Sequence, residues 1–438
     1  MNREMKDSGI LAIGAIPKEW KPIRIKYLLQ NGVIKSGPYG SALKEVASAD
    51  GEYPIYNQAN IINDDFSLRR NYISSKDYIN MKRYKIHSGD IVFSMMGTVG
   101  KCSIVPEWID EGIIDSHLFE ATLNSLINKD YFKYSYDKDL CVQVIEQFIE
   151  AMNGSIMSGL NGGLVKNSFI CLPSPTEQQQ IVHFLDRKCT AIDTAIEKTK
   201  KSIEKLEEYK KAVITKAVTK GIDPNAKMKD SGVEWIGEIP EGWEVKQLRT
   251  YFSRRINKNI YLQESNLLSL SYGHIVRKNI DTKEGLLPES FDGYNIVEDG
   301  DIVIRGTDLQ NDHRSLRTGL VTERGIITSA YITLKPKEDV NSAYYHYLLH
   351  CYDISKVFYS MGGGLRQSLD YWEFIRIPVL HPTDREQEEI ISYIKTKCTA
   401  IDAAIEKKKK AIEKWEEYKK SLIYYAVTGK IDCRNEVI

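Results

Sequence analysis

The stretch KCTAIDTAIEKTKKSIEKLEEYKKAVITKAVT, residues 188–219, returns as KCTAIDAAIEKKKKAIEKWEEYKKSLIYYAVT, residues 397–428, with 24 of 32 positions identical. Neither copy contains Pro or Gly, and apolar residues recur in each at heptad spacing. This pattern predicts a long helix with a narrow apolar seam in each copy. A capping-box pattern precedes each copy, at Thr176–Gln179 and at Thr383–Glu386, so each helix should run over roughly 60 Å at 1.5 Å per residue.

The two seams are expected to pair with each other, because a partner helix in the same chain is already tethered. An intermolecular dimer is the alternative, and an antiparallel pair would relate the two halves of the chain by a pseudo-twofold axis. Polar Thr199 and Lys408 interrupt the seams and could fix their register. The helix-pairing residues we expect are Ile192, Ile196, Ile203, Leu206 and Val213 in the first helix, and Ile401, Ile405, Ile412, Trp415 and Leu422 in the second.

A second repeat lies at the start of each half. MKDSGILAIGAIPKEW at residues 5–20 returns as MKDSGVEWIGEIPEGW at residues 228–243. The blocks between head and helix differ, apart from a short match of residues 89–93 to residues 300–304. The pattern predicts an α+β chain with two globular α/β blocks, residues 1–172 and 223–381, and two helical segments, residues 173–222 and 382–438. The frame is circular, so the first head should meet the last tail in space.

The bulk composition is that of an ordinary globular protein. The chain has 438 residues, too many for one core, with 42% hydrophobic and 27% charged residues and no net charge. No apolar run is long enough for a membrane span, and the start does not resemble a secretory signal. The seven scattered cysteines indicate a reducing cytoplasm, and without close-spaced ligands no metal site is expected.

Several loops carry the residue types that read DNA bases. Asn and Gln pair with adenine, Arg with guanine, and Asp or Glu accepts from cytosine, although any single loop of this kind is more often an ordinary turn. The candidates in the first block are Lys35, Tyr39, Ser41, Asn57, Gln58, Asn60, Arg69 and Arg70. Those in the second are Ser271, Tyr272, His274, Arg277, Arg305, Asp308, Gln310, Asn311, Arg314 and Arg317.

No catalytic motif is found in the sequence. Residues 97–103, GTVGKCS, lack the spacing of a phosphate-binding loop, and residues 362–364, GGG, lack that of a dinucleotide fingerprint. There is no Asn-Pro-Pro-aromatic or Asp-Pro-Pro-aromatic run of the kind that amino-methyltransferases carry. The sequence therefore predicts a binding protein with no catalytic residue and no metal ligand.

The whole frame resembles the specificity subunits of type I restriction–modification systems. The resemblance rests on the KDSG…IP…W heads, the Pro…Glu-Gln helix starts at Glu177-Gln178 and Glu386-Gln387, the AVT…ID helix ends, and the Gly-Asp-Ile-Val strands. It implies two target recognition domains held apart by an antiparallel pair of helices, each domain reading half of a split double-stranded DNA site.

The resemblance also implies partners. Two modification (methyltransferase) subunits would dock on the helices and methylate adenine, and restriction (translocase/nuclease) subunits would translocate and cut the DNA. S-adenosylmethionine, ATP and Mg²⁺ are then expected on those subunits and no cofactor on this chain. A coiled-coil scaffold without DNA binding is the alternative, and a self-contained DNA enzyme is a further one.

Overall fold

Two helices of the predicted length run through the chain. They are α7, Pro175–Lys220, and α10, Asp384–Val427, of 46 and 44 residues, in a computed structural model that describes residues 3–38, 40–96, 98–151, 161–280, 290–309, 316–361 and 368–435. The chain divides into unit 1, Met1–Thr199 with Lys409–Ile438, and unit 2, Lys200–Lys408. Each unit therefore includes part of both helices, so these units do not follow the boundaries drawn from the sequence.

The two helix starts are capped at equivalent positions. Thr383 and Glu386 form the expected capping box, with Thr383 N donating to Glu386 Oε2 at 3.0 Å. In the first copy the cap is Ser174, whose Oγ accepts from Glu177 N at 3.3 Å, and not Thr176 as predicted. Pro175 causes the difference, because proline favours the first helical position and so places the cap at the residue before it.

In unit 1 the helix pair is antiparallel. Near the start of α7, Gln180 donates to Arg434 O at 2.9 Å, and further along, Asp193 pairs with Lys419 at 2.6 Å. Residue numbers thus rise on one segment as they fall on the other. Four apolar residues of α10, Leu422, Ile423, Ala426 and Val427, enter the same core as Ile181, Leu185, Ile192 and Ile196 of α7.

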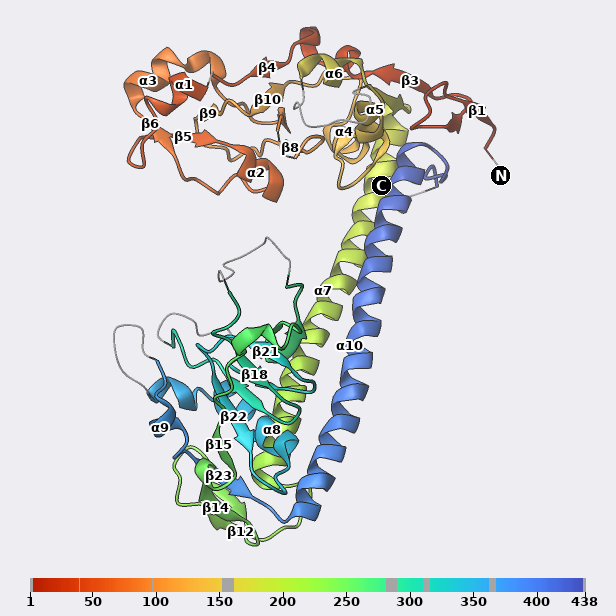
Figure 1. Ribbon diagram of the computed structural model, residues 1–438. Coiled ribbons are helices and arrows are strands. Elements are labelled where there is room, and N and C mark those ends of the chain that lie inside the picture. The colour runs from red at the N-terminus through yellow and green to blue at the C-terminus, as the bar shows by residue number, and fades with distance from the viewer. Residues whose placement is uncertain are drawn as a thin grey trace. The chain divides into compact units, whose positions relative to one another are not determined.

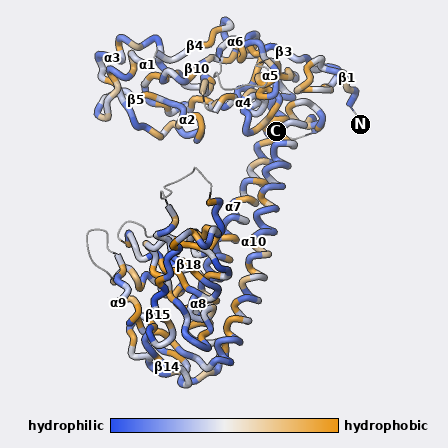
Figure 2. The backbone as a smooth tube through the Cα atoms, in the orientation of Figure 1, coloured by the Kyte–Doolittle hydropathy of each residue, from blue (hydrophilic) through white to orange (hydrophobic). Residues whose placement is uncertain are grey.

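In unit 2 the same arrangement recurs with the roles of the helices exchanged. Lys210 of α7 pairs with Asp402 of α10 at 2.7 Å. The end of α7 supplies Ile214, Ala217 and Val218 to a core that also contains Ile390, Ile394 and Cys398 from the start of α10. Figure 2 shows α7 and α10 as largely hydrophilic tubes with interspersed hydrophobic residues, as expected for helices with a narrow seam.

The predicted seam is buried near both ends of each helix but not in the middle. Ile192, Ile196, Val213, Ile401, Ile405 and Leu422 are buried, whereas Ile203, Leu206 and Ile412 are half-buried. Trp415 is a correction, because its side chain is 41% exposed and contacts Tyr418 at a ring distance of 6.0 Å. Near the helix ends the seam also packs into the globular cores of the two units, whereas Trp415 belongs to neither core.

Unit 1 contains a four-stranded antiparallel sheet in the order β4-β10-β7-β8 (Figure 1). A second sheet has the order β6-β5-β9, and the small helices α1 to α6 complete the block. The bounds are β4 Lys35–Ser36, β5 Tyr53–Tyr56, β6 Tyr72–Ile73, β7 Ile91–Ser94, β8 Cys102–Ile104, β9 Ile113–Ile114, β10 Leu118–Ala121, α1 Gly40–Lys44, α2 Gln58–Asn63, α3 Ser75–Asn80, α4 Lys129–Tyr136, α5 Gln143–Ala151 and α6 Gly162–Asn167.

Unit 2 repeats the four-stranded sheet in the equivalent order β15-β22-β19-β20, and adds two strand pairs, β16-β17 and β18-β21. It also contains α8 and α9. The bounds are β15 Phe252–Arg254, β16 Leu268–Ser271, β17 His274–Arg277, β18 Asn295–Val297, β19 Ile302–Ile304, β20 Thr318–Leu320, β21 Gly325–Ile327, β22 Ile332–Pro336, α8 Ser342–Ile354 and α9 Tyr371–Phe374. The repeated sheet shows that the two blocks share a scaffold although their sequences hardly match.

The heads form short strand pairs at the helix ends. They are β1 Met5–Asp7 with β2 Ala15–Pro17, and β12 Met228–Asp230 with β13 Glu238–Pro240. Each is followed by a strand that pairs with the strand just before the helix: β3 Lys21–Arg24 with β11 Phe169–Leu172, and β14 Glu244–Gln247 with β23 Pro378–His381.

The expected meeting of first head and last tail is confirmed within unit 1. Tyr424 Oη and Lys430 Nζ both donate to Ile13 O, at 3.0 and 3.2 Å. In unit 2, Lys220 Nζ donates to Ile236 O, the equivalent carbonyl, at 3.3 Å. The chain is broken at one of two equivalent junctions and continuous at the other. In the described part of the chain no helix is long and apolar enough to cross a membrane.

Candidate nucleic-acid interface

In unit 1 the structure brings two candidate loops together. Gln58 Nε2 donates to Ser94 Oγ at 3.0 Å and also to Met96 O, so the start of α2 is fixed to the turn that follows β7. Asn57 caps α2 and accepts from Ala59 N at 2.8 Å. The amide of Gln58 is therefore engaged within the fold, and the polar face offered here is a combined surface of both loops.

Several candidates of the first block, basic and polar, lie at the surface. Lys35, Ser41 and Arg70 are exposed, on β4, on α1 and after α2 respectively. Arg69 pairs with Asp110 at 2.6 Å, which orients its guanidinium along the surface. Tyr39 lies outside the described residues. These side chains come from separate segments that the sequence order alone does not join.

Asn60 was predicted as a candidate DNA contact, but its side chain is fully buried and cannot reach a base. Its Oδ1 accepts from Asn57 N at 2.8 Å, and its Nδ2 donates to Leu68 O at 2.7 Å. The side chain closes the capping box of α2 and holds the following loop. An amide that satisfies three backbone groups in this way stabilises the turn on which the neighbouring candidates lie.

In unit 2 the candidates 271–274 form a two-residue hairpin turn between β16 and β17. Tyr272 and Gly273 both have positive φ, 45° and 80°, as a type I′ turn requires. The Tyr272 side chain is 82% exposed at the tip, and His274 is exposed beside it. A Cβ on Gly273 would lie 3.1 Å from Leu316, so the hairpin packs closely on the segment that leads into β20.

Arg317, predicted as a candidate DNA contact, also differs from that prediction. It is fully buried, and its guanidinium donates to Arg305 O at 3.1 Å, Thr307 O at 2.7 Å and Asp308 O at 3.1 Å. Its ring contact with Tyr359, at 5.2 Å, covers the remaining face. Arg317 therefore shapes the turn after β19 from inside, and the half-buried Arg305 and Asp308 lie on that turn. This turn is the equivalent of the Ser94–Met96 turn in unit 1.

Of the remaining candidates of unit 2, one is exposed and three lie outside the described residues. Arg277 is exposed and its Nε donates to both oxygens of Glu323 at 2.8 Å; these bonds raise the pKa of Arg277 and lower that of Glu323. Gln310, Asn311 and Arg314 lie outside the described residues. The described candidates thus surround one edge of the second block, between the 272–273 hairpin and the 305–308 turn.

Sequence reasoning missed an exposed apolar turn in unit 2. Tyr261 and Leu262 have positive φ, 66° and 53°, and their side chains are 87% and 58% exposed. A bulky residue in this backbone region is costly, and such strain concentrates at functional sites. The sequence carries no signal for it, because Asn259-Ile260-Tyr261-Leu262 contains neither Gly nor Pro.

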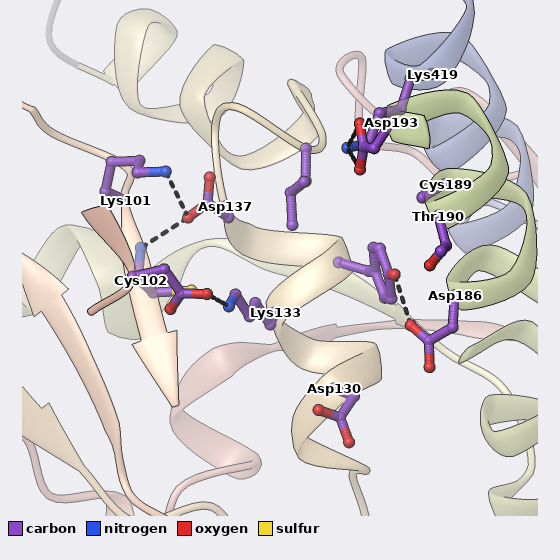
Figure 3. A pocket seen from close by; sticks show the side chains of 13 residues that line it. Lys101, Cys102, Asp130, Lys133, Asp137, Asp186, Cys189, Thr190, Asp193 and Lys419 are labelled. Carbon is purple, nitrogen blue, oxygen red and sulfur yellow. Dashed lines mark hydrogen bonds and ion pairs between the residues drawn. The ribbon is translucent and has the colours of Figure 1, made fainter. Parts of the chain in front are cut away.

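A cavity of about 380 Å³ lies in unit 1 between α4, β8 and the two long helices (Figure 3). Three ion pairs line it: Lys133 with Asp64 at 2.6 Å, Lys101 with Asp137 at 3.6 Å, and Asp193 with Lys419 at 2.6 Å. Burial raises the pKa of Asp137 and of the Cys102 thiol. A thiol with a raised pKa is a poor nucleophile, so this arrangement does not suggest a catalytic cysteine.

The comparisons with known proteins agree with the repeated frame. Residues 17–208 match the family model described as type I restriction modification DNA specificity domain. Two proteins of Methanocaldococcus jannaschii match nearly end to end. The one described as the MjaX type I restriction enzyme specificity subunit is 27% identical, and the MjaVIII specificity subunit is 24% identical, each over 96% of this chain and 95% of the relative. The chain is thus similar along nearly its whole length to specificity subunits of type I restriction–modification systems.

Solved structures of specificity subunits share the fold. A chain from a study of the assembly of a type I restriction–modification system aligns with a TM-score of 0.66 at 12% identity, covering 95% of this chain and 99% of that chain. The HsdS subunit of Thermoanaerobacter tengcongensis aligns with a TM-score of 0.51 at 14% identity, covering 95% and 98%. The DNA specificity family favours the DNA-binding interpretation over a scaffold without DNA.

Proposed function

We propose that this chain is a specificity subunit that reads a bipartite double-stranded DNA target, one half-site for each globular block. One observation carries the proposal: the two blocks share one sheet order but differ in the turns at its edge. The turn after β7 presents the exposed Met96, whose carbonyl Gln58 holds, whereas the turn after β19 presents the half-buried Arg305 and Asp308, whose carbonyls Arg317 holds. A constant scaffold with variable edge chemistry is suited to two different sequence preferences.

The chain itself is proposed to be non-catalytic. In the complex, modification subunits would supply S-adenosylmethionine and methylate adenine, and restriction subunits would supply ATP and Mg²⁺ for translocation and cleavage. Each unit offers exposed aromatic residues on a long helix as docking positions for a modification subunit: Trp415 and Tyr418 in unit 1, and Tyr209 in unit 2. Tyr and Trp are enriched in protein interfaces, where they provide large contact areas at low entropic cost.

An exchange of blocks tests the proposal. Residues 238–380 are replaced by the matching block of another specificity subunit, and the methylated motif is read by single-molecule sequencing of DNA from cells that also express the modification subunit. We expect one half of the motif to change and the other to stay. The reciprocal exchange of residues 15–172 is the matched control and should change the other half. A motif that changes in both halves, or in neither, would contradict one block per half-site.

A further inference from the structure

A buried acidic pair lies at the start of β7 in unit 1. Asp90, just before β7, is 4% exposed, and Glu120 on β10 is 1% exposed. His87 contacts both: its Nδ1 lies 3.3 Å from Glu120 Oε1 and 3.8 Å from Asp90 Oδ2. One ligand atom of each of the three residues lies within 4.8 Å of the others. The backbone N of His87 also donates to Glu120 Oε1 at 2.9 Å, which fixes this turn to the strand.

At the equivalent position in unit 2, the buried carboxylate is neutralised by an arginine. Asp301 follows Gly300 as Asp90 follows Gly89, and it forms an ion pair with Arg255. Register identifies the other equivalents. Glu120 lies opposite Val92 and Thr333 opposite Val303, so threonine replaces the second acid. Unit 2 therefore has one buried carboxylate and one guanidinium where unit 1 has two carboxylates.

In unit 1 the basic residue at the equivalent position, Lys35, does not form such an ion pair with the buried carboxylates. Lys35 faces Glu120 across β4 and β10, as Arg255 faces Thr333, but its side chain is exposed. Within the described residues neither Asp90 nor Glu120 forms an ion pair with a lysine or arginine, and Glu120 Oε2 is buried without a hydrogen-bond partner. Two buried carboxylates in contact are costly unless a cation or a proton compensates them.

We propose that His87, Asp90 and Glu120 bind one divalent transition-metal ion, with Zn²⁺ the best match to the donor set. Zn²⁺ accepts both imidazole nitrogen and carboxylate oxygen as ligands, and an imidazole ligand favours a transition metal over Mg²⁺ or Ca²⁺. Donor atoms about 2.1 Å from a tetrahedral ion lie about 3.4 Å apart. The separations of 3.3 and 3.8 Å from His87 Nδ1 are close to that spacing. The His87 side chain is 47% exposed, which leaves the ion a path from solvent.

In unit 1 the ion would take the charge-neutralising role that Arg255 has in unit 2. It would neutralise the buried carboxylates and tie the His87–Gly89 turn to β10, at the end of the strand that leads to the Ser94–Met96 turn. His87 and Asp90 are close in sequence, but Glu120 lies 33 residues after His87, which is why no metal site was expected from spacing. This inference does not depend on DNA recognition, since it concerns the stability of the first block.

Metal titration of the intact chain tests the proposal. The purified protein is stripped with a chelator and titrated with Zn²⁺ by calorimetry, and with Co²⁺ by visible absorption, which reports the ligand field directly. We expect one high-affinity ion per chain, lost in His87→Gln and in Glu120→Gln. His350→Gln is the matched control for adventitious binding, because His346 and His350 also lie one turn apart on α8, and it should keep the site. Hydrogen exchange should show protection of residues 86–92 on metal addition.

A second variant separates the metal site from the fold. Lys35→Arg combined with Glu120→Thr reproduces the residues of unit 2, and it should fold, bind no ion at this position and show no metal-dependent protection. His87 is half exposed, so His87→Gln should remain folded even if Glu120→Gln does not. The proposal is overturned if the wild-type chain takes up no ion, or if His87→Gln binds Zn²⁺ with the wild-type affinity and Co²⁺ spectrum. In the first case a proton shared by Asp90 and Glu120 would be the compensation.

Discussion

The indole nitrogen of Trp20 donates a hydrogen bond of 2.8 Å to Glu177 Oε2, joining the first head to the first turn of α7. The equivalent bond from Trp243 to Glu386 Oε1, at 3.3 Å, joins the second head to α10. Arg3 adds an ion pair to Glu177 in the first copy, where both side chains are 7% exposed. The Trp and Glu of the two repeated motifs are therefore structural partners, which explains why both recur in the sequence.

Loss of this indole donor should loosen the start of α7. In Trp20→Phe the ring packing is largely kept, but the nearly buried Glu177 carboxylate loses one donor, which costs about 1–3 kcal/mol. Hydrogen exchange of residues 174–181 is the suitable measurement, since a chain with two units need not unfold in one step. Trp243→Phe removes the longer bond and should give a smaller effect at residues 383–390. Equal effects at both sites would contradict a role for bond length and for Arg3.

The apolar seam should stabilise the helix pair far more than its ion pairs do. Ile196→Ala removes a side chain that is 6% exposed, and the loss should be about 2–4 kcal/mol. Lys419→Ala breaks the pair with Asp193, whose side chains are 23% and 53% exposed, and should cost at most about 1 kcal/mol. Hydrogen exchange of residues 185–199 in unit 1 compares the variants, since it reports local stability without one-step unfolding. Raising the salt concentration should reduce the difference between Lys419→Ala and wild type, and leave that of Ile196→Ala.

Arg317 should matter for DNA reading without touching DNA. Arg317→Met fills similar space but removes the donors to three carbonyls of residues 305–308, which should cost about 3 kcal/mol or more in unit 2. Methylation at the second half-site should become less selective, with the first half-site unchanged. Arg305→Ala keeps the turn and should reduce recognition with little loss of stability. Equal thermal stability of Arg317→Met and wild type would show that the guanidinium is not a structural support.

Low pH should destabilise unit 2 through α8. Burial lowers the pKa of His346 to about 3 and that of His350 to about 4; the positive neighbours Lys210 and Lys211 add to the shift of His350. The unfolded chain therefore binds more protons below its histidine pKa of about 6.5, and stability falls as pH decreases from there. Each histidine should contribute a loss of about 1–2 kcal/mol at pH 5. In the double variant His346→Gln with His350→Gln, hydrogen exchange of α8, corrected for intrinsic rates, should no longer depend on pH in this way. His183→Gln, at an exposed position of α7, is the control.

The sequence predicts the periodic parts of this fold and little of the rest. Helices α7 and α10 were predicted to within a few residues, because a heptad seam and a helix start are local signals. The four-stranded sheets were not predicted, since they join strands of two to five residues from distant segments, such as β4 and β10. Arg317 illustrates the limit for the candidate site. Its sequence neighbours look like those of a surface arginine, and only the return of the 305–308 turn buries it.

The duplicated frame predicts that a chain of residues 1–222 works as a homodimer. Unit 1 needs Leu422, Ile423, Ala426 and Val427 from α10 to complete its core, and the repeat places Val213, Ile214, Ala217 and Val218 at the same positions. The partner's first helix can therefore supply a nearly identical face. Its Lys210 is the equivalent of Lys419, so the pair with Asp193 would be kept as well.

Such a dimer carries two copies of the first block and should read the first half-site with its inverted copy. Methylome sequencing of cells that express residues 1–222 with the modification subunit should show this palindrome methylated. Ile214→Asp is the matched control, because the full chain uses Ile214 only in unit 2 whereas the dimer would need it in unit 1. It should abolish dimerisation and methylation together. A soluble dimer that binds the modification subunit but leaves every such palindrome unmethylated would contradict the equivalence of the two junctions.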